Sequence, residues 1–238
     1  MEIYLFLCII AFCAGFIQGL SGFGSVLLSL PLLALFLDIK TVIPFVALLG
    51  VTLSIFLSIQ LRQHWDWKKI YPFCLGSIPG IPVGVLFLNR IDGQLIQWTV
   101  GVVLVAYAIY GLLLNPAVRK MGRAWAYSFG FAAGFLGGAI SASGPPVIVY
   151  TSLQPWTKDQ IKVTLQGFFI ISGILVVLSQ AMAGLVTRQV LFYFLIALPL
   201  LLIGTWLGSF LSGRIREETF RKIILIMMGL LGLFIIFK

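Results

Sequence analysis

Two short segments rich in glycine and serine carry the residues whose types and spacing are best suited to chemistry. They run over residues 19–25 and 137–146, and both lie inside otherwise apolar sequence. Each segment predicts a break after which a short helix begins, near Gly24 and near Pro145. The first N–H groups of a helix have no intrahelical acceptor and lie at the positive end of its dipole, so such helix starts attract anions.

The residue types within the breaks strengthen this interpretation. Glycine lets the backbone approach a ligand without a side chain in the way, and Pro145-Pro146 suit the first turn of a helix. Serine hydroxyls add hydrogen-bond donors at Ser21, Ser25, Ser141 and Ser143. Together these residues predict an oxyanion cradle at each break.

The elements that must position these cradles are membrane-spanning helices. Of the 238 residues, 61% are hydrophobic and 10% are charged, and the mean hydropathy is +1.11. Soluble domains average about 45–50% apolar and about 25% charged residues, which excludes a soluble fold. Apolar stretches of spanning length occur at residues 3–20, 41–60, 70–89, 94–114, 124–140, 163–183, 190–212 and 219–237.

The first apolar stretch is expected to remain in the protein, because Met1-Glu2-Ile3 lacks the basic start of a signal peptide. The run from Ile3 to Leu37 would measure about 52 Å as one straight helix, against a hydrocarbon core of about 30 Å. It must therefore break or fold back at the first glycine segment.

Close helix packing is the alternative explanation of some glycines. The pairs Gly15–Gly19 and Gly134–Gly138 have the spacing of small-xxx-small motifs, which favours packing for these four. Residues 21–25 and 141–146 favour a ligand site, because consecutive helix breakers at membrane depth are tolerated only where they are buried or line a cavity. For the amides of Gln18 and Gln166, interhelical hydrogen bonding and ligand binding both stay open.

The two breaks occupy corresponding positions in the chain. Ala14-Gly15-Phe16 recurs as Ala133-Gly134-Phe135. At a shift of 120 residues, Gly24 matches Gly144, Gln60 matches Gln180, Pro79 matches Pro199 and Gly84 matches Gly204. This order predicts a duplication with repeats at 1–118 and 119–238. Each repeat is expected to have a broken or re-entrant first helix followed by three transmembrane helices.

The basic residues discriminate between two topologies, because cytoplasmic loops are enriched in Lys and Arg. If each break segment crosses the membrane once, the sixteen basic residues divide eight against eight. If each makes two short crossings or a re-entrant hairpin, they divide twelve against four, the four being Lys40, Arg90, Arg188 and Lys238. The second topology inverts the two repeats and predicts an inner-membrane protein with both termini outside.

The net charge of +9 is ascribed to this topology. The basic residues form no stripe with aromatic partners, so no nucleic-acid partner is expected.

No carboxylate suited to proton transfer or cation binding lies in the middle of a span. All seven carboxylates lie at span ends or in loops, at Glu2, Asp38, Asp66, Asp92, Asp159, Glu217 and Glu218. The three cysteines have no second Cys or His at metal-ligand spacing, and His64 lies in a tryptophan-flanked interfacial loop. We therefore expect no enzyme activity, no metal and no cofactor, and the coupling ion stays open.

A known family shows the same order of motifs. Gly15-Phe16-x2-Gly19-x2-Gly22-x-Gly24 before Pro31, then Trp65-Asp66-Trp67, then Pro79-x4-Gly84 and the repeated second half, resembles the sulfite exporter TauE/SafE family of permeases. The resemblance covers essentially the whole chain. It implies a small transporter for sulfite, sulfonates such as sulfoacetate, or related organosulfur anions. The matching broken helices predict a secondary transporter with a midplane site formed by both breaks. We expect export, a direction that the sequence itself leaves open. Family members often have three successive glycines where this chain has Gly22-Phe23-Gly24, so the particular anion stays open.

The resemblance also implies which residues bind the substrate. They are Gly19, Ser21, Gly22, Gly24 and Ser25 at the first break, and Gly138, Ser141, Ser143, Gly144 and Pro145 at the second. Gln166 is added to this set only because it is an amide inside an apolar run. The expected partners are a small anion and the bilayer, and a homodimer stays open. The alternative function is a non-transporting membrane scaffold or accessory subunit that packs through its glycine faces.

Overall fold

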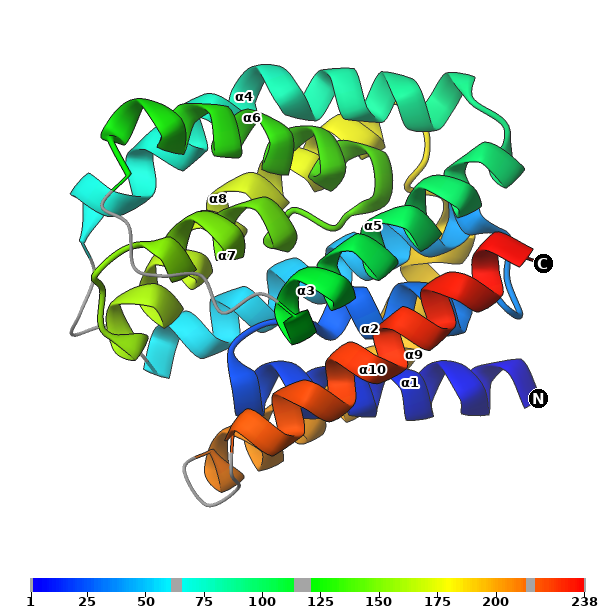
Figure 1. Ribbon diagram of the computed structural model, residues 1–238. Coiled ribbons are helices and arrows are strands. Elements are labelled where there is room, and N and C mark those ends of the chain that lie inside the picture. The colour runs from blue at the N-terminus through cyan, green and yellow to red at the C-terminus, as the bar shows by residue number, and fades with distance from the viewer. Residues whose placement is uncertain (1, 61–65, 114–120, 213–216, 238) are drawn as a thin grey trace. The chain divides into compact units, whose positions relative to one another are not determined.

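The fold is entirely helical over the part of the chain that the computed structural model describes, which comprises residues 2–60, 66–113, 121–212 and 217–237. This confirms the predicted fold class. The helices are α1 (Glu2–Ser21), α2 (Ser25–Leu33), α3 (Ile39–Gln60), α4 (Trp67–Arg90), α5 (Gly93–Leu113), α6 (Arg123–Ile140), α7 (Gly144–Leu153), α8 (Lys158–Met182), α9 (Arg188–Leu211) and α10 (Glu217–Phe237) (Figure 1).

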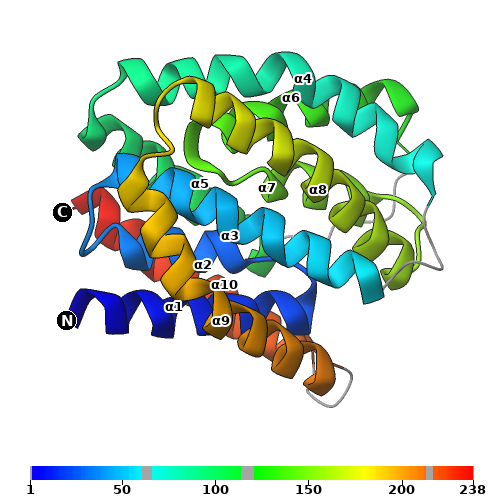
Figure 2. The same ribbon diagram turned by 180° about the vertical axis from the view of Figure 1, so that it is seen from behind.

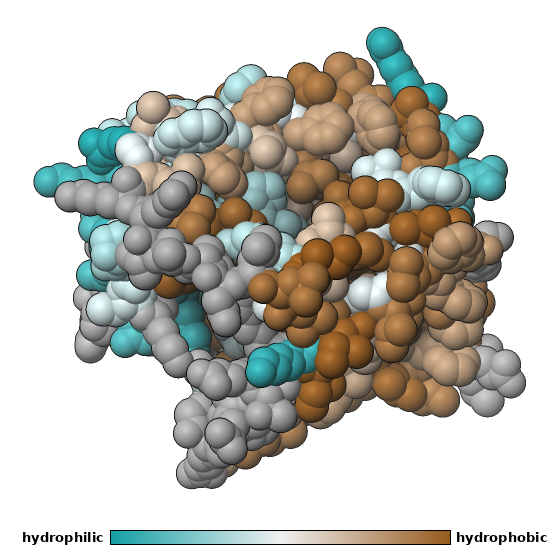
Figure 3. Space-filling view, in the orientation of Figure 1, coloured by the Kyte–Doolittle hydropathy of each residue, from teal (hydrophilic) through white to brown (hydrophobic). Residues whose placement is uncertain are grey.

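Six of the described helices are long and apolar enough to cross a bilayer, namely α1, α3, α4, α5, α8 and α9. Their outer faces carry large apolar side chains such as Leu5, Leu195 and Trp206, each more than half exposed. Apolar residues dominate much of the face seen in Figure 3. Such surfaces are typical of helices that contact lipid, and the prediction of a multi-pass membrane protein is confirmed.

Both halves of the chain have the same order of helices: one long helix, one short helix and three long ones. The short helices, α2 and α7, have nine and ten residues, or about 14–15 Å, roughly half of a hydrocarbon core. Helices of this length are too short to cross a full hydrocarbon core, and the choice between a re-entrant hairpin and two short crossings stays a prediction. The inverted placement of the halves stays a prediction.

The helices pack into two compact units, and each unit takes segments from both halves of the chain. Unit 1 comprises Met1–Leu49, Ile91–Asn115 and Arg188–Lys238, and unit 2 comprises Gly50–Arg90 and Pro116–Thr187. This grouping follows packing and does not test the predicted repeats. The predicted repeat boundary at 118 and 119, like the loop residue His64, lies outside the described residues.

In unit 1, α1 and α9 lie parallel and in close contact. A Cβ atom added to Gly15 would lie 2.8 Å from Thr205 Oγ1, and one added to Gly19 would lie 2.9 Å from Ser209 N. The Ser212 hydroxyl donates to Leu20 O at 3.1 Å near the end of both helices. Small residues allow this close backbone approach.

In unit 2, α4 and α6 pack in the same way, parallel and side by side (Figures 1 and 2). A Cβ atom would lie 2.7 Å from Ser77 Cα if added to Gly134, and 2.8 Å from Val85 N if added to Gly138. Glycines of α4, such as Gly84, meet the backbone of α6 in return. The four glycines for which the sequence favours packing therefore all lie in helix–helix contacts.

At each break the short helix runs back alongside the preceding long helix, toward the start of that long helix. In unit 2, Gln154 Nε2 donates to Met121 O at 3.2 Å, which joins the end of α7 to the start of α6. In unit 1, the rings of Phe6 and Phe36 stack with centroids 5.0 Å apart, so the segment after α2 lies beside the start of α1. Within its own unit, each break segment is therefore a hairpin.

Candidate functional site

The first break is a glycine turn between α1 and α2. Gly22 and Gly24 have φ angles of 84° and 101°, in the left-handed region that side chains with a Cβ rarely adopt. Gly22 N–H donates to Gln18 O at 2.7 Å and closes the end of α1. The chain then enters α2 at Ser25, with Gly24 as the residue before the helix.

The side chains of the first break are hydrogen-bonded locally. Ser21 Oγ lies 2.7 Å from both Ile17 O and Phe23 O, so its hydroxyl donates to backbone carbonyls. The Ser25 hydroxyl donates to Gln18 Oε1, and both residues are buried. Ser25 and Gln18 therefore satisfy each other, while Ser21 bonds to the backbone.

The backbone at the start of α2 offers hydrogen-bond donors. The N–H groups at residues 24–27 have no intrahelical acceptor, and no side chain caps this end. A Cβ atom added to Gly24 would meet only Ile17 Cγ2, at 3.6 Å, so little covers the backbone on that side. A helix start without a side-chain cap suits an anion.

The second break differs in its backbone. α6 ends at Ile140, and Ser141 takes the left-handed conformation with φ 56°. Ser141 N–H donates to Gly137 O at 2.9 Å and Ala142 N–H donates to Leu136 O at 3.3 Å. These two bonds cap α6 before α7 begins at Gly144.

The start of α7 has fewer N–H donors than the start of α2. Pro145 and Pro146 are the second and third residues of α7, and proline has no backbone N–H. Ser143 precedes the helix without a side-chain cap bond. Two of the four donors that a helix start normally offers are therefore missing.

One face of α8 lines the second break. Val176 Cγ2 would lie 3.3 Å from a Cβ atom added to Gly137, and Phe169 Cζ would lie 3.5 Å from one added to Gly144. One turn beyond Val176, Gln180 Nε2 donates to Ser141 Oγ at 3.3 Å. Gln180 is 0% exposed, and its Oε1 atom has no hydrogen-bond partner in the protein.

The structure gathers most of the predicted site residues within their own breaks. Ser21, Gly22, Gly24 and Ser25 lie together at the first break, and Ser141, Ser143, Gly144 and Pro145 lie together at the second. Gly19 and Gly138 face α9 and α4 instead, which gives both a packing role. Gln166 is fully buried on α8, about one helical turn before Phe169.

For Gln18 the sequence left ligand binding open, and for Gln180 it indicated no place in the site. The structure bonds Gln18 to Ser25 and Gln180 to Ser141, so each break contains a serine–glutamine pair. A buried amide in an apolar run was the available signal for both. The partner of Gln180 could not be inferred, because Gln180 lies 39 residues from Ser141 in the chain.

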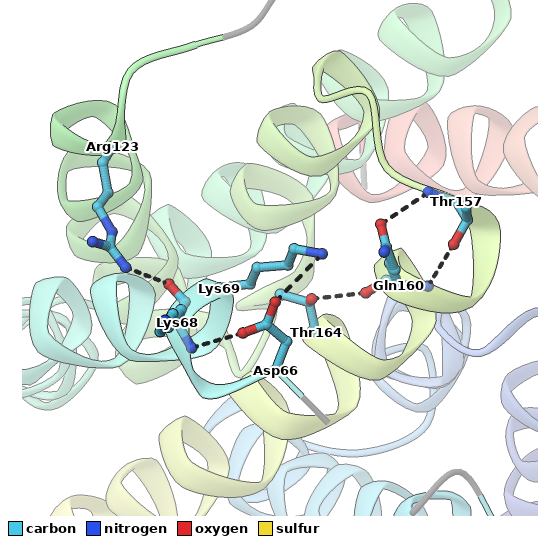
Figure 4. A network of polar contacts seen from close by, with 7 residues as sticks. All are labelled: Asp66, Lys68, Lys69, Arg123, Thr157, Gln160 and Thr164. Atoms are coloured by element: carbon cyan, nitrogen blue, oxygen red, sulfur yellow. Dashed lines mark hydrogen bonds and ion pairs between the residues drawn. The ribbon is translucent and has the colours of Figure 1, made fainter. Parts of the chain in front are cut away.

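A polar network gathers basic residues at one end of unit 2 (Figure 4). Arg123 Nη2 donates to Lys68 O at 3.0 Å, and Lys69 Nζ lies 3.5 Å from Asp66 Oδ2 and 5.0 Å from the Trp156 ring centroid. At the same end, Thr157 and Gln160 form a capping box at the start of α8. The starts of α4, α6 and α8 therefore meet, as expected if the α6–α7 segment folds back.

Comparisons with known proteins place these features in a family context. Residues 7–235 match the family described as sulfite exporter TauE/SafE. A relative from Cupriavidus necator, described as "Probable sulfite/organosulfonate exporter TauE", is 28% identical over 166 residues. That match covers 68% of this chain and 64% of the relative, so it spans less than two thirds of the relative's length. No solved structure matches the chain significantly.

Proposed function

Because the chain belongs to the sulfite exporter TauE/SafE family, we propose that it is a secondary transporter that exports a small sulfur-containing oxyanion or organosulfonate. The substrate class includes sulfite and sulfoacetate, and the membrane is the cell's inner membrane. The observation that carries the proposal is the start of α2 at Gly24, which no side chain caps and where an added Cβ atom would meet only Ile17. The C. necator relative's description as a sulfite/organosulfonate exporter supports the same substrate class.

Of the two breaks that the sequence predicts to bind the substrate, the first is proposed as the anion contact, because Pro145 and Pro146 leave the second with fewer backbone donors. Sulfite and sulfonate groups present oxygens that can accept several N–H bonds at once, and a helix start supplies such donors in a fixed geometry. Hydrogen bonds to a charged group contribute about 1.5–3 kcal/mol each. Two or three bonds therefore supply much of the binding energy of a small anion without a basic side chain.

The membrane potential favours export. Moving one negative charge out of a cell with an inside-negative potential of 100 mV is favourable by about 2.3 kcal/mol. Export of a monovalent anion through alternating access thus needs no hydrolysis step.

The described residues contain no group of three or more His, Cys, Asp or Glu that could hold a metal ion.

The scaffold alternative is less well supported by the packing. A scaffold would present its glycine faces to a partner protein. Here Gly15 and Gly19 pack on α9, and Gly134 and Gly138 pack on α4. These faces are used inside the chain, which favours transport. A homodimer stays a prediction.

Ligand-dependent thermal stabilisation of the purified protein tests the proposal. The panel contains sulfite, sulfoacetate, taurine, sulfate and a carboxylate analogue of sulfoacetate, because a ligand that binds only the folded state raises its apparent stability. We expect stabilisation by sulfite or sulfonates and saturable flux of the same compounds in proteoliposomes. Stabilisation by none of them, with no flux, would leave the scaffold as the better explanation.

A further inference from the structure

We propose that the second break binds a small monovalent cation, with Gln180 Oε1 and Ser141 Oγ among its ligands. The starting observation is a buried amide that the protein only half satisfies. Gln180 Nε2 bonds to Ser141 Oγ at 3.3 Å, while Gln180 Oε1 is buried without a partner. A buried acceptor without a donor is unfavourable, and a bound cation would satisfy it.

The residue that bonds to Gln180 lies next to a row of backbone acceptors. Ser141 follows directly on α6, whose last carbonyls, at residues 138–140, have no intrahelical donor. These carbonyls lie at the negative end of the helix dipole, which favours a cation. Unwound backbone and helix C-termini in discontinuous membrane helices bind Na⁺ in this way.

The ligand set favours a monovalent ion. An amide oxygen, a hydroxyl oxygen and backbone carbonyls are all neutral, whereas protein sites for Ca²⁺ and Mg²⁺ normally include carboxylates. Among the described residues there is no group of three His, Cys, Asp or Glu that would suit a more highly charged ion. Na⁺ or K⁺ is therefore the ion that best fits these neutral oxygen ligands.

The first break lacks this arrangement. Gln18 Oε1 accepts from the Ser25 hydroxyl, and the Ser21 hydroxyl donates to backbone carbonyls. The second break also lacks the backbone donors that an anion needs, because Pro145 and Pro146 occupy the first turn of α7. The cation is therefore assigned to the second break alone, and the site does not depend on which anion is transported.

The test measures the thermal stability of the full-length purified protein in NaCl, KCl and choline chloride at equal ionic strength, without any sulfur compound. We expect a saturable rise in melting temperature with Na⁺ or K⁺ relative to choline. Gln180→Leu should remove this rise. Gln180→Glu, which places a carboxylate at the same position, should lower the half-saturating cation concentration about tenfold, equivalent to about 1.4 kcal/mol.

Gln154→Leu is the matched control. Gln154 is also a buried glutamine of unit 2, 6% exposed, but it bonds to Met121 O at the other end of the α6–α7 hairpin. This variant should have a lower melting temperature and keep the full cation-dependent rise. Loss of the rise in Gln154→Leu as well would indicate a general packing effect and overturn the assignment.

Other outcomes also overturn the proposal. If wild-type protein shows no difference between alkali cations and choline, the Gln180 oxygen binds only a buried water. If Gln180→Glu loses the rise while folding normally, the amide donates to a ligand instead of accepting. If Gln180→Leu fails to fold, the cation-dependent rise in melting temperature of the wild-type protein and of Gln180→Glu still tests the proposal. Stabilisation by sulfite in choline medium tests the proposed transport function separately, so either proposal can fail alone.

Discussion

The two helix breaks have the same architecture but differ in their backbone donors and in the partners of their buried glutamines. In both, a long helix ends in a left-handed residue, a half-length helix follows, and a serine is bonded to a buried glutamine. At the first break the left-handed residues are glycines and the new helix keeps all its backbone donors. At the second, the left-handed residue is Ser141, and two prolines remove donors. A few residues thus decide how many backbone donors a break offers and whether the oxygen of its buried glutamine has a partner.

What the two breaks share is their support. The helix before each break packs on a parallel helix through glycines, α1 on α9 and α6 on α4. Close backbone contact fixes where each long helix ends, and hence where its break lies. Glycine-mediated packing on a parallel helix is therefore common to both breaks, while the polar atoms that each break offers to a ligand differ.

The largest expected effect separates anion binding at the first break from backbone strain. Gly24→Leu should reduce sulfite or sulfonate flux in proteoliposomes roughly 100-fold or more, because the side chain would cover N–H donors worth about 1.5–3 kcal/mol each. Gly184 is the matched control, since its φ is also left-handed, at 76°, with no atom within 4 Å of an added Cβ. Gly184→Leu should retain most of the flux. Equal losses in both variants would show that strain alone explains the effect.

Replacing a packing glycine before either break should lower the stability of the protein by a similar amount. Gly19→Ala and Gly138→Ala each insert a methyl group against the backbone of a neighbouring helix and should lower the free energy of unfolding by about 1–3 kcal/mol. Thermal denaturation in detergent measures this. Gly122→Ala, where an added Cβ meets nothing within 4 Å, should change little. A marked loss at only one of the two breaks would contradict their shared support.

Alanine substitutions at Gly24 and at Gly144, which occupy corresponding positions, should show that only the first break needs a left-handed residue at this position. Gly24→Ala forces a left-handed residue with a Cβ and should cost about 1–2 kcal/mol of stability. Gly144→Ala should cost less than about 0.5 kcal/mol, because the added Cβ would meet Ile148 and Phe169 only at 3.5 Å. The difference between the two melting temperatures is the measurement. Equal values would mean that the breaks do not differ in backbone strain.

The smallest effect concerns the serines. Ser25→Ala leaves the buried Gln18 Oε1 without its donor and should cost about 1 kcal/mol of stability. Ser143→Ala is the comparison at the second break, because Ser143 makes no side-chain cap bond, and it should be close to neutral. Chemical denaturation followed by tryptophan fluorescence can resolve this difference. A larger effect for Ser143→Ala would argue for a side-chain role at the second break.

Local properties of the chain determined much of this protein. Composition and apolar length predicted a helical membrane protein, because lipid tolerates few other backbone arrangements. Clusters of glycine, serine and proline predicted both breaks, because such residues favour the turns that end one helix and start the next, although prolines inside α4 do not interrupt it. The glycine spacing at Gly15–Gly19 and Gly134–Gly138 predicted close packing, and the structure places all four in such contacts.

Only the tertiary structure decided which helices those glycines meet and which amides reach the breaks. The partner of α1 is α9, nearly 190 residues away at Cys8 and Ile196, and the partner of Ser141 is Gln180 on α8. Such pairings depend on how helices of the two halves interleave within each unit, which hydropathy does not encode. The donor or acceptor balance at a break also requires knowing which polar atoms remain without partners. That balance follows from the packed arrangement of several helices, so local sequence could locate the breaks but not assign their ligands.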